Sequence, residues 1–180
     1  SLAQLPLAFE PNQGQSDSRV LYLSRNPGYA LFLTAQEAVV ALRGAERPVR
    51  LAWQGADPHP QVEGEDTLPG KRNYLKGNDP ARWQRDIPTF SKVRYSNLYP
   101  GIDLVYYGQQ RQLEYDLVVA PGADPAAIRF RLTGMDTMKL DERGALQLQV
   151  AQRSLSLNKP LVYQETAGEK PIVDGGYVLL

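Results

Sequence analysis

Apolar and polar residues alternate along much of this chain in short runs that turn residues separate. The clearest run is Gln112–Val119, where apolar positions 113, 115, 117 and 119 alternate with Glu114 and Asp116. Ile102–Tyr107, rich in β-branched and aromatic residues, precedes it, and Gly108 with the two glutamines that follow supplies the bend. The pattern predicts a β-hairpin with one buried face and with its carboxylates on the solvent face.

Similar short runs recur on both sides of this hairpin. The further predicted strands are Arg19–Ser24, Tyr29–Leu33, Glu37–Arg43, Val49–Gln54, Gln61–Glu63, Lys71–Lys76, Phe90–Tyr95, Ile128–Thr133, Lys139–Asp141, Ala145–Val150, Ser154–Leu157, Leu161–Glu165 and Ile172–Leu180. No window of helical period exceeds about two turns. We therefore expect an all-β fold, an antiparallel β-sandwich built from short meandering hairpins, as one sandwich or two packed halves.

The chain of 180 residues fits a single all-β domain, residues 1–180. Residues 55–70 interrupt the strand pattern and are interpreted either as a long functional loop or as a boundary between two halves. Single helical turns are predicted at Pro80–Trp83, capped by Asp79, and at Asp124–Ala127. The apolar end at Tyr177–Leu180 suggests a domain that continues past Leu180.

Composition narrows the classes of function. The formal net charge is zero and basic residues are scattered, so we expect no nucleic-acid partner. Cysteine is absent and His59 is the only histidine, which leaves no disulfide, no Ser-His-Asp set and no zinc site to build. Ser1–Phe9 is not a signal peptide, and no apolar run is long enough for membrane insertion. We expect no metal, no cofactor and no catalytic residues.

Candidate ligand-binding residues gather in and near the central hairpin. Glu114 and Asp116 share a strand face roughly 7 Å apart, a spacing that suits glycoside hydrolysis but is equally that of solvent-facing charges on a sheet. Tyr106, Tyr107 and Trp83 offer aromatic surface for sugars or protein partners, with core packing as the alternative for each of them. These five residues are the candidate site, and none of them is assigned a catalytic role.

Four stretches of the chain resemble a known family. They are FEPNQGQ at Phe9–Gln15, NYLKGNDPARW at Asn73–Trp83, the hairpin region Tyr99–Pro125, and KPLVYQE at Lys159–Glu165. Together they are similar to a bacterial domain of unknown function that stands N-terminal to SBBP-type β-propeller repeats in large secreted or surface proteins. The resemblance implies an extracytoplasmic location and a chain that continues past Leu180 into further strands and the repeats. It supplies no catalytic or binding residues.

Three hypotheses for function follow. The first is a non-enzymatic extracytoplasmic module that serves adhesion, assembly or presentation, with the downstream repeats or a surface protein as its partner. The alternative is a carbohydrate-binding or carbohydrate-active domain that uses the tyrosines and carboxylates of the 99–119 hairpin to bind glycans. A third is an inhibitor-like or chaperone-like module that acts by strand addition at its sheet edges.

Overall fold

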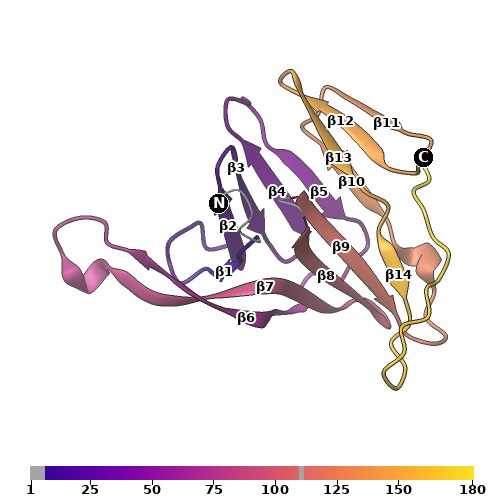
Figure 1. Cartoon of the computed structure of the whole chain (residues 1–180), viewed down its shortest axis with the longest axis horizontal. Coiled ribbons are helices and arrows are strands. Elements are labelled where there is room, and N and C mark those ends of the chain that lie inside the picture. Colours follow the sequence, from indigo (N-terminus) through magenta and orange to yellow (C-terminus); the bar gives the residue numbers. More distant parts are fainter. Residues whose placement is uncertain (1–6, 110–111) are drawn as a thin grey trace.

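The computed structural model describes residues 7–109 and 112–180, and these form β-strands with short turns of 3-10 helix (Figure 1). The strands are β1 (Glu10–Pro11), β2 (Tyr22–Asn26), β3 (Tyr29–Leu33), β4 (Glu37–Leu42), β5 (Val49–Trp53), β6 (Gln61–Tyr74), β7 (Gln84–Tyr99), β8 (Ile102–Gln109), β9 (Gln112–Val119), β10 (Phe130–Thr133), β11 (Thr137–Leu140), β12 (Leu146–Val150), β13 (Arg153–Leu157) and β14 (Leu161–Tyr163). The 3-10 turns are η2 (Pro80–Arg82) and η3 (Pro125–Ala127). The predicted cap of the first turn is confirmed, because Asp79 accepts a hydrogen bond from the backbone N–H of Ala81. Asp124 caps the second turn in the same way, by accepting from the N–H of Ala126.

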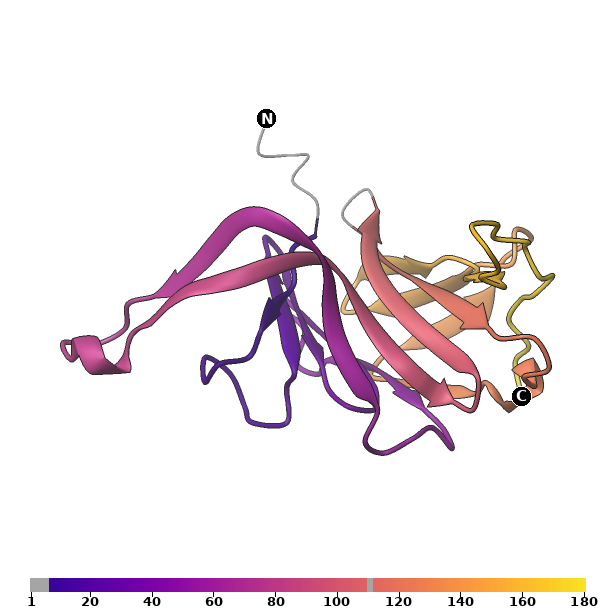
Figure 2. The same cartoon turned by 90° about the horizontal axis from the view of Figure 1, so that it is seen from below.

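The described strands make three sheets, and none of the sheets closes into a barrel. One has the order β1-β2-β3-β4-β5-β10, one has β14-β9-β8-β7-β6, and a small one has β11-β12-β13. Neighbouring strands pair antiparallel except β14, which runs parallel to β9. Figure 2 shows the six-stranded sheet packed against the other two. The prediction of an all-β sandwich is confirmed.

A continuous core lies between the sheets and includes Trp53 of β5. The indole Nε1 of Trp53 donates a hydrogen bond to the hydroxyl of Tyr106 on β8, at 2.9 Å. The same indole packs edge-to-face on Tyr115 of β9 and on Phe130 of β10, with ring centroids 5.7 and 5.4 Å apart. Such pairs contribute beyond their buried area, so Trp53 fixes the six-stranded sheet against the central hairpin.

Strands β6 and β7 form a ribbon that reaches beyond the sandwich and ends in the turn η2 (Figure 1). They are 14 and 16 residues long, and they pair from Gln61 opposite Ser96 to Tyr74 opposite Gln84. The short strand predicted at Gln61–Glu63 is confirmed, and the expectation of a loop is wrong for residues 64–70. The outer part of the ribbon is largely exposed on both faces, so its sequence lacks the apolar alternation that predicts a strand. A register shift accommodates Pro69 on this edge strand.

Two other expectations are corrected. Residues 172–180 do not form a strand and make only an isolated bridge, between Ile172 and Tyr163. Gly108 belongs to β8 and not to the bend, whose Gln110 lies outside the described residues. The reason for a glycine in this strand is a close approach. A Cβ at position 108 would stand 2.2 Å from the Cβ of Leu7, so only glycine lets the N-terminal segment cross here.

Two glycines of β6 provide a matched test of packing on the ribbon. A Cβ on Gly64 would lie 2.4 Å from the ring of Phe90, whereas a Cβ on Gly70 meets nothing closer than Thr89 Oγ1 at 3.9 Å. We expect Gly64→Ala to lower the free energy of unfolding by about 1–3 kcal/mol, because the ring must move. Gly70→Ala is expected to change it by no more than about 0.5 kcal/mol. Urea denaturation of both variants measures this, and equal effects would contradict it.

Candidate functional site

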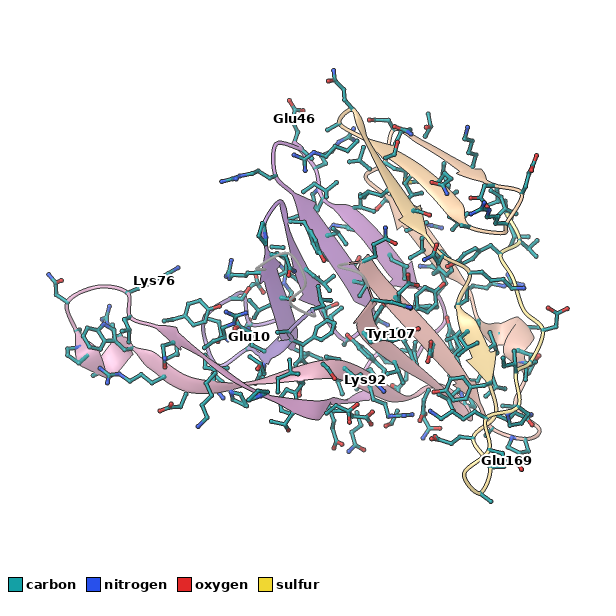
Figure 3. All side chains as sticks on the ribbon, in the orientation of Figure 1. Glu10, Glu46, Lys76, Lys92, Tyr107 and Glu169 are labelled. Atoms are coloured by element: carbon teal, nitrogen blue, oxygen red, sulfur yellow. The ribbon has the colours of Figure 1, made fainter. Side chains whose placement is uncertain are left out.

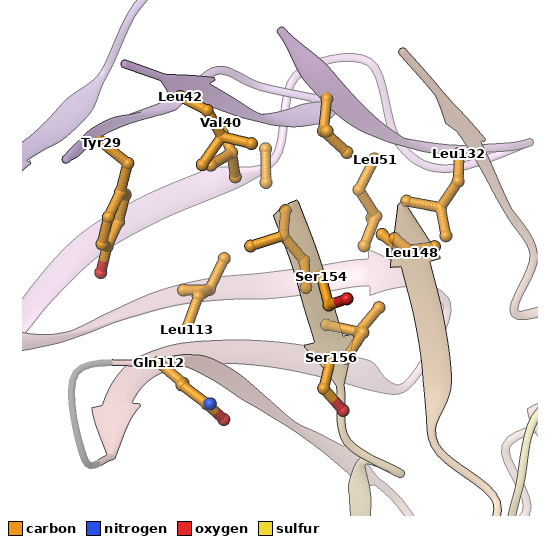
Figure 4. A pocket seen from close by; sticks show the side chains of 14 residues that line it. Tyr29, Val40, Leu42, Leu51, Gln112, Leu113, Leu132, Leu148, Ser154 and Ser156 are labelled. Carbon is orange, nitrogen blue, oxygen red and sulfur yellow. The ribbon is translucent and has the colours of Figure 1, made fainter. Parts of the chain in front are cut away.

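An apolar cleft opens between the sheets where the sandwich is not closed (Figure 4). Val40, Leu51 and Leu132 line it from the six-stranded sheet, and Leu113 of β9 and Leu155 of β13 line it from the opposite side. Its volume is about 180 Å³. The alternation of apolar residues builds this cleft, because each strand directs one face inward and no described strand fills the space between β9 and β13.

Polar groups are confined to the rim of the cleft. Ser154 and Ser156 accept hydrogen bonds from the side-chain amides of Gln149 and Gln147, at 2.7 and 3.1 Å, so both hydroxyls are held by β12. Among the described lining residues, Tyr29 is the only one with an ionisable side chain. Nor do residues 7–109 and 112–180 contain a group of acidic and histidine side chains that could hold a metal ion. The lining of the cleft is therefore largely apolar, with one phenol, that of Tyr29, whose pKa burial raises.

The structure does not bring the five predicted site residues together. Tyr106 lies in the core with 1% of its surface exposed and accepts the hydrogen bond from Trp53. Trp83 lies at the end of the ribbon, where its Nε1 donates to the carbonyl of Gly77 at 3.0 Å and the guanidinium of Arg85 covers its ring. Figure 3 shows the distance between these regions, with Lys76 at the projecting end and Tyr107 on the sandwich.

Tyr107, Glu114 and Asp116 do share the outer face of the hairpin, but this face is not open to solvent as predicted. Glu114 is 8% exposed and Tyr107 and Asp116 are half-buried. Strand β14 covers part of the face, where Tyr163 packs on Val105 and Val118. The alternating residues of β9 therefore lie on two faces that are both at least partly covered. Sequence spacing alone could not show that a later strand would pair here.

The two carboxylates are engaged within the protein. Burial raises the pKa of Glu114, and the hydrogen bond donated by Asn158 Nδ2 at 2.6 Å opposes that shift. Burial likewise raises the pKa of Asp116, opposed by the hydroxyl of Tyr107, which donates at 2.8 Å. Each carboxylate thus has a structural partner, and the arrangement presents no open pair of acids to a substrate.

A domain family of unknown function, DUF7948, matches residues 9–180. The chain belongs to this family. Searches of curated proteins and of solved structures found no match. Membership bears out the part of the resemblance that named a domain of unknown function, and the match begins at Phe9, where the first motif begins. Within the described part of this DUF7948 domain, no helix is long and apolar enough to cross a membrane.

The cleft was missed by residue-level reasoning. Its residues occur in the sequence as ordinary apolar positions of predicted strands, such as Leu113, Leu132 and Leu155. The cleft arises because the two sides of the sandwich contain unequal numbers of strands. Which strands lie on which side depends on pairing between distant segments. A space between two sheets is a property of that pairing, not of any single run.

Glu114 offers a test of the burial effect on stability. Because the pKa of Glu114 is raised in the folded state, folding binds protons and stability falls as the pH rises through the folded pKa. Glu114→Gln removes the charge but keeps an oxygen to accept from Asn158. We expect the variant to have a higher urea midpoint than the unaltered domain at about pH 8, and the difference to vanish at about pH 3.5.

Glu142→Gln is the control, since Glu142 is exposed in the turn between β11 and β12 and loses little water on folding. Its midpoint should match that of the unaltered domain at both pH values. A Glu114→Gln variant less stable than the unaltered domain at about pH 8 would show instead that the carboxylate contributes net stabilisation.

Proposed function

We propose that this DUF7948 domain is a non-catalytic assembly module that binds an apolar segment of a protein partner in the cleft between β9 and β13. The observation that carries the proposal is an open cleft whose lining is largely apolar. A cavity of roughly 150 Å³ holds a benzene-sized group, whereas pockets for drug-sized molecules measure about 300–1,000 Å³. At about 180 Å³ the cleft therefore suits one large apolar side chain that anchors a longer segment.

The proposed setting is an extracytoplasmic one, secreted or at the cell surface, ahead of SBBP-type β-propeller repeats. The four sequence motifs support it, and the cysteine-free composition is compatible with it. In that setting the downstream repeats or a surface protein would supply the segment. Of adhesion, assembly and presentation, the cleft favours assembly, because burial of apolar surface is the main driving force for association between protein chains.

The carbohydrate hypothesis has less support. The hydroxyl of Tyr107 is committed to Asp116, Glu114 is buried against Asn158, and Tyr106 and Trp83 lie elsewhere. A sugar-binding face needs polar groups that are available to hydroxyls of the ligand. The hairpin uses those groups internally.

Selection from a random peptide library on the purified domain tests the assembly function. We expect the selected peptides to share an apolar anchor residue and to lose about tenfold or more in affinity on Leu155→Asp, because a carboxylate placed in the cleft is costly to bury. Leu140→Asp is the matched control, since Leu140 is exposed on β11 and does not line the cleft.

Circular dichroism of both variants establishes that they fold. A library that yields no binder would overturn the proposal, as would binders insensitive to Leu155→Asp. Binding of a glycan array that is lost on Tyr107→Phe would favour the carbohydrate hypothesis instead.

A further inference from the structure

We infer that the segment bound in the cleft is an extended strand of another polypeptide, which pairs with β13 on one side and with the first residues of β9 on the other. The inference rests on the proposed function and specifies the chemistry of the ligand. Its basis is the direction of backbone hydrogen-bonding groups on the two strands that flank the cleft.

Strand β13 is the outer strand of its sheet and borders the cleft. A two-residue loop connects it to β12, and Val150 and Arg153 are the pair that closes this hairpin. Such loops are closed by a pair that exchanges both hydrogen bonds, and the pairing then alternates along the ladder. The main-chain groups of Leu155 and Leu157 therefore point toward β12, and those of Ser154 and Ser156 point away from it.

The other face of β12 agrees with this assignment. The carbonyl of Gln149 accepts from the N–H of Asp136, and the carbonyl of Ala145 accepts from the N–H of Asp141, both next to β11. Odd-numbered residues of β12 therefore bond to β11 and even-numbered ones to β13. No described strand pairs with the main-chain N–H and C=O groups of Ser154 and Ser156.

The same reasoning applies to β9. The N–H of Ala120 donates to the carbonyl of Gly101, so even-numbered residues of β9 bond to β8 and odd-numbered ones face the opposite side. Strand β14 pairs on that side only with Asp116–Val118. The pair of Leu161 with Asp116 engages the carbonyl of Tyr115. Among the described residues, the N–H of Tyr115 and both main-chain groups of Leu113 therefore have no strand partner there. Two rows of unpaired main-chain groups thus border the same apolar cleft.

An added strand satisfies both rows at once. Residues of β13 lead through Asn158–Pro160 into β14, so the space between β13 and the start of β9 continues the line of the β14–β9 ladder. A strand placed there would join the five-stranded and three-stranded sheets into one layer opposite the six-stranded sheet. Its alternate side chains would point into the cleft and into solvent, so the ligand carries an apolar residue at every second position.

The sequence of β13 supports pairing at this edge. Outer strands of natural sheets are protected by proline, bulges and charges. Strand β6 has Pro69, register shifts and several charges, and β1 contains Pro11. Strand β13 reads RSLSL, with one charge at its start and with neither proline nor a bulge. An edge left unprotected beside an apolar cleft is what a site for strand addition requires.

A peptide of alternating valine and threonine with a lysine at each end is the probe. We expect it to bind the purified domain and to slow hydrogen exchange at the amides of Leu113, Ser154 and Ser156. The same peptide with N-methyl groups on the threonine amides keeps every side chain but lacks those donors. Its affinity should fall about tenfold or more, because several hydrogen bonds are lost together.

A pair of variants tests the protein side. Ser154→Pro removes the outward N–H of β13 without removing a bond to β12, and should weaken binding of the unmodified peptide about tenfold. Leu140→Asp, on the exposed face of β11 and outside the cleft, is the control and should bind normally. The methylated peptide gives the same information on the unaltered domain if Ser154→Pro does not fold.

The outcomes separate the two proposals. Equal affinity of both peptides, with loss on Leu155→Asp, would overturn strand addition and leave the apolar binding function intact. Absence of any binding, together with no selected library peptide, would overturn both. Slowed exchange at the same amides in the domain alone, dependent on its concentration, would identify a second copy of this chain as the occupant and overturn the assignment to another polypeptide.

Discussion

The contact between Trp53 and Tyr106 is the constraint on which the rest of the arrangement depends. A buried indole N–H requires an acceptor, and the hydroxyl of Tyr106 supplies it from the opposite sheet. The pair fixes where the hairpin β8–β9 lies over β5, and the rings of Tyr115 and Phe130 around it leave little freedom to shift. With the hairpin held at this point, the start of β9 is set over β4 and β5, and the cleft lies beside it.

Much of the fold followed from sequence because it consists of local hairpins. Tyr29–Leu33 was predicted to the residue, and both helical turns were predicted, the first with Asp79 as its cap. Three segments of the ribbon were predicted as strands, but residues 64–70 were missed, for the opposite reason. Most side chains of residues 66–73 are exposed, so this part of the strand is specified by pairing with β7 and not by a pattern of its own.

The candidate site was less predictable than the fold, because it depends on contacts between distant segments. Spacing placed Glu114 and Asp116 together correctly, but it could not show that Asn158 and Tyr163, more than forty residues later, would pack on the same face. It also could not separate Tyr106 from Tyr107, since neighbours in a strand point to opposite faces and either face could have been the core. The cleft has no local signature at all.

The position of Glu114 at the closed end of the cleft explains why the protein buries this carboxylate. Its carboxylate accepts from the side chain of Asn158, at the point where the chain leaves β13 and turns into β14. Tyr177 donates to the carbonyl of the same asparagine, and its oxygen stands 2.7 Å from the hydroxyl of Tyr115 on β9. These contacts tie the end of β13 to β9 at Asn158, whereas no described strand joins them beyond it. A carboxylate whose burial is unfavourable thus holds the closed end of the cleft and leaves the other end open to a partner.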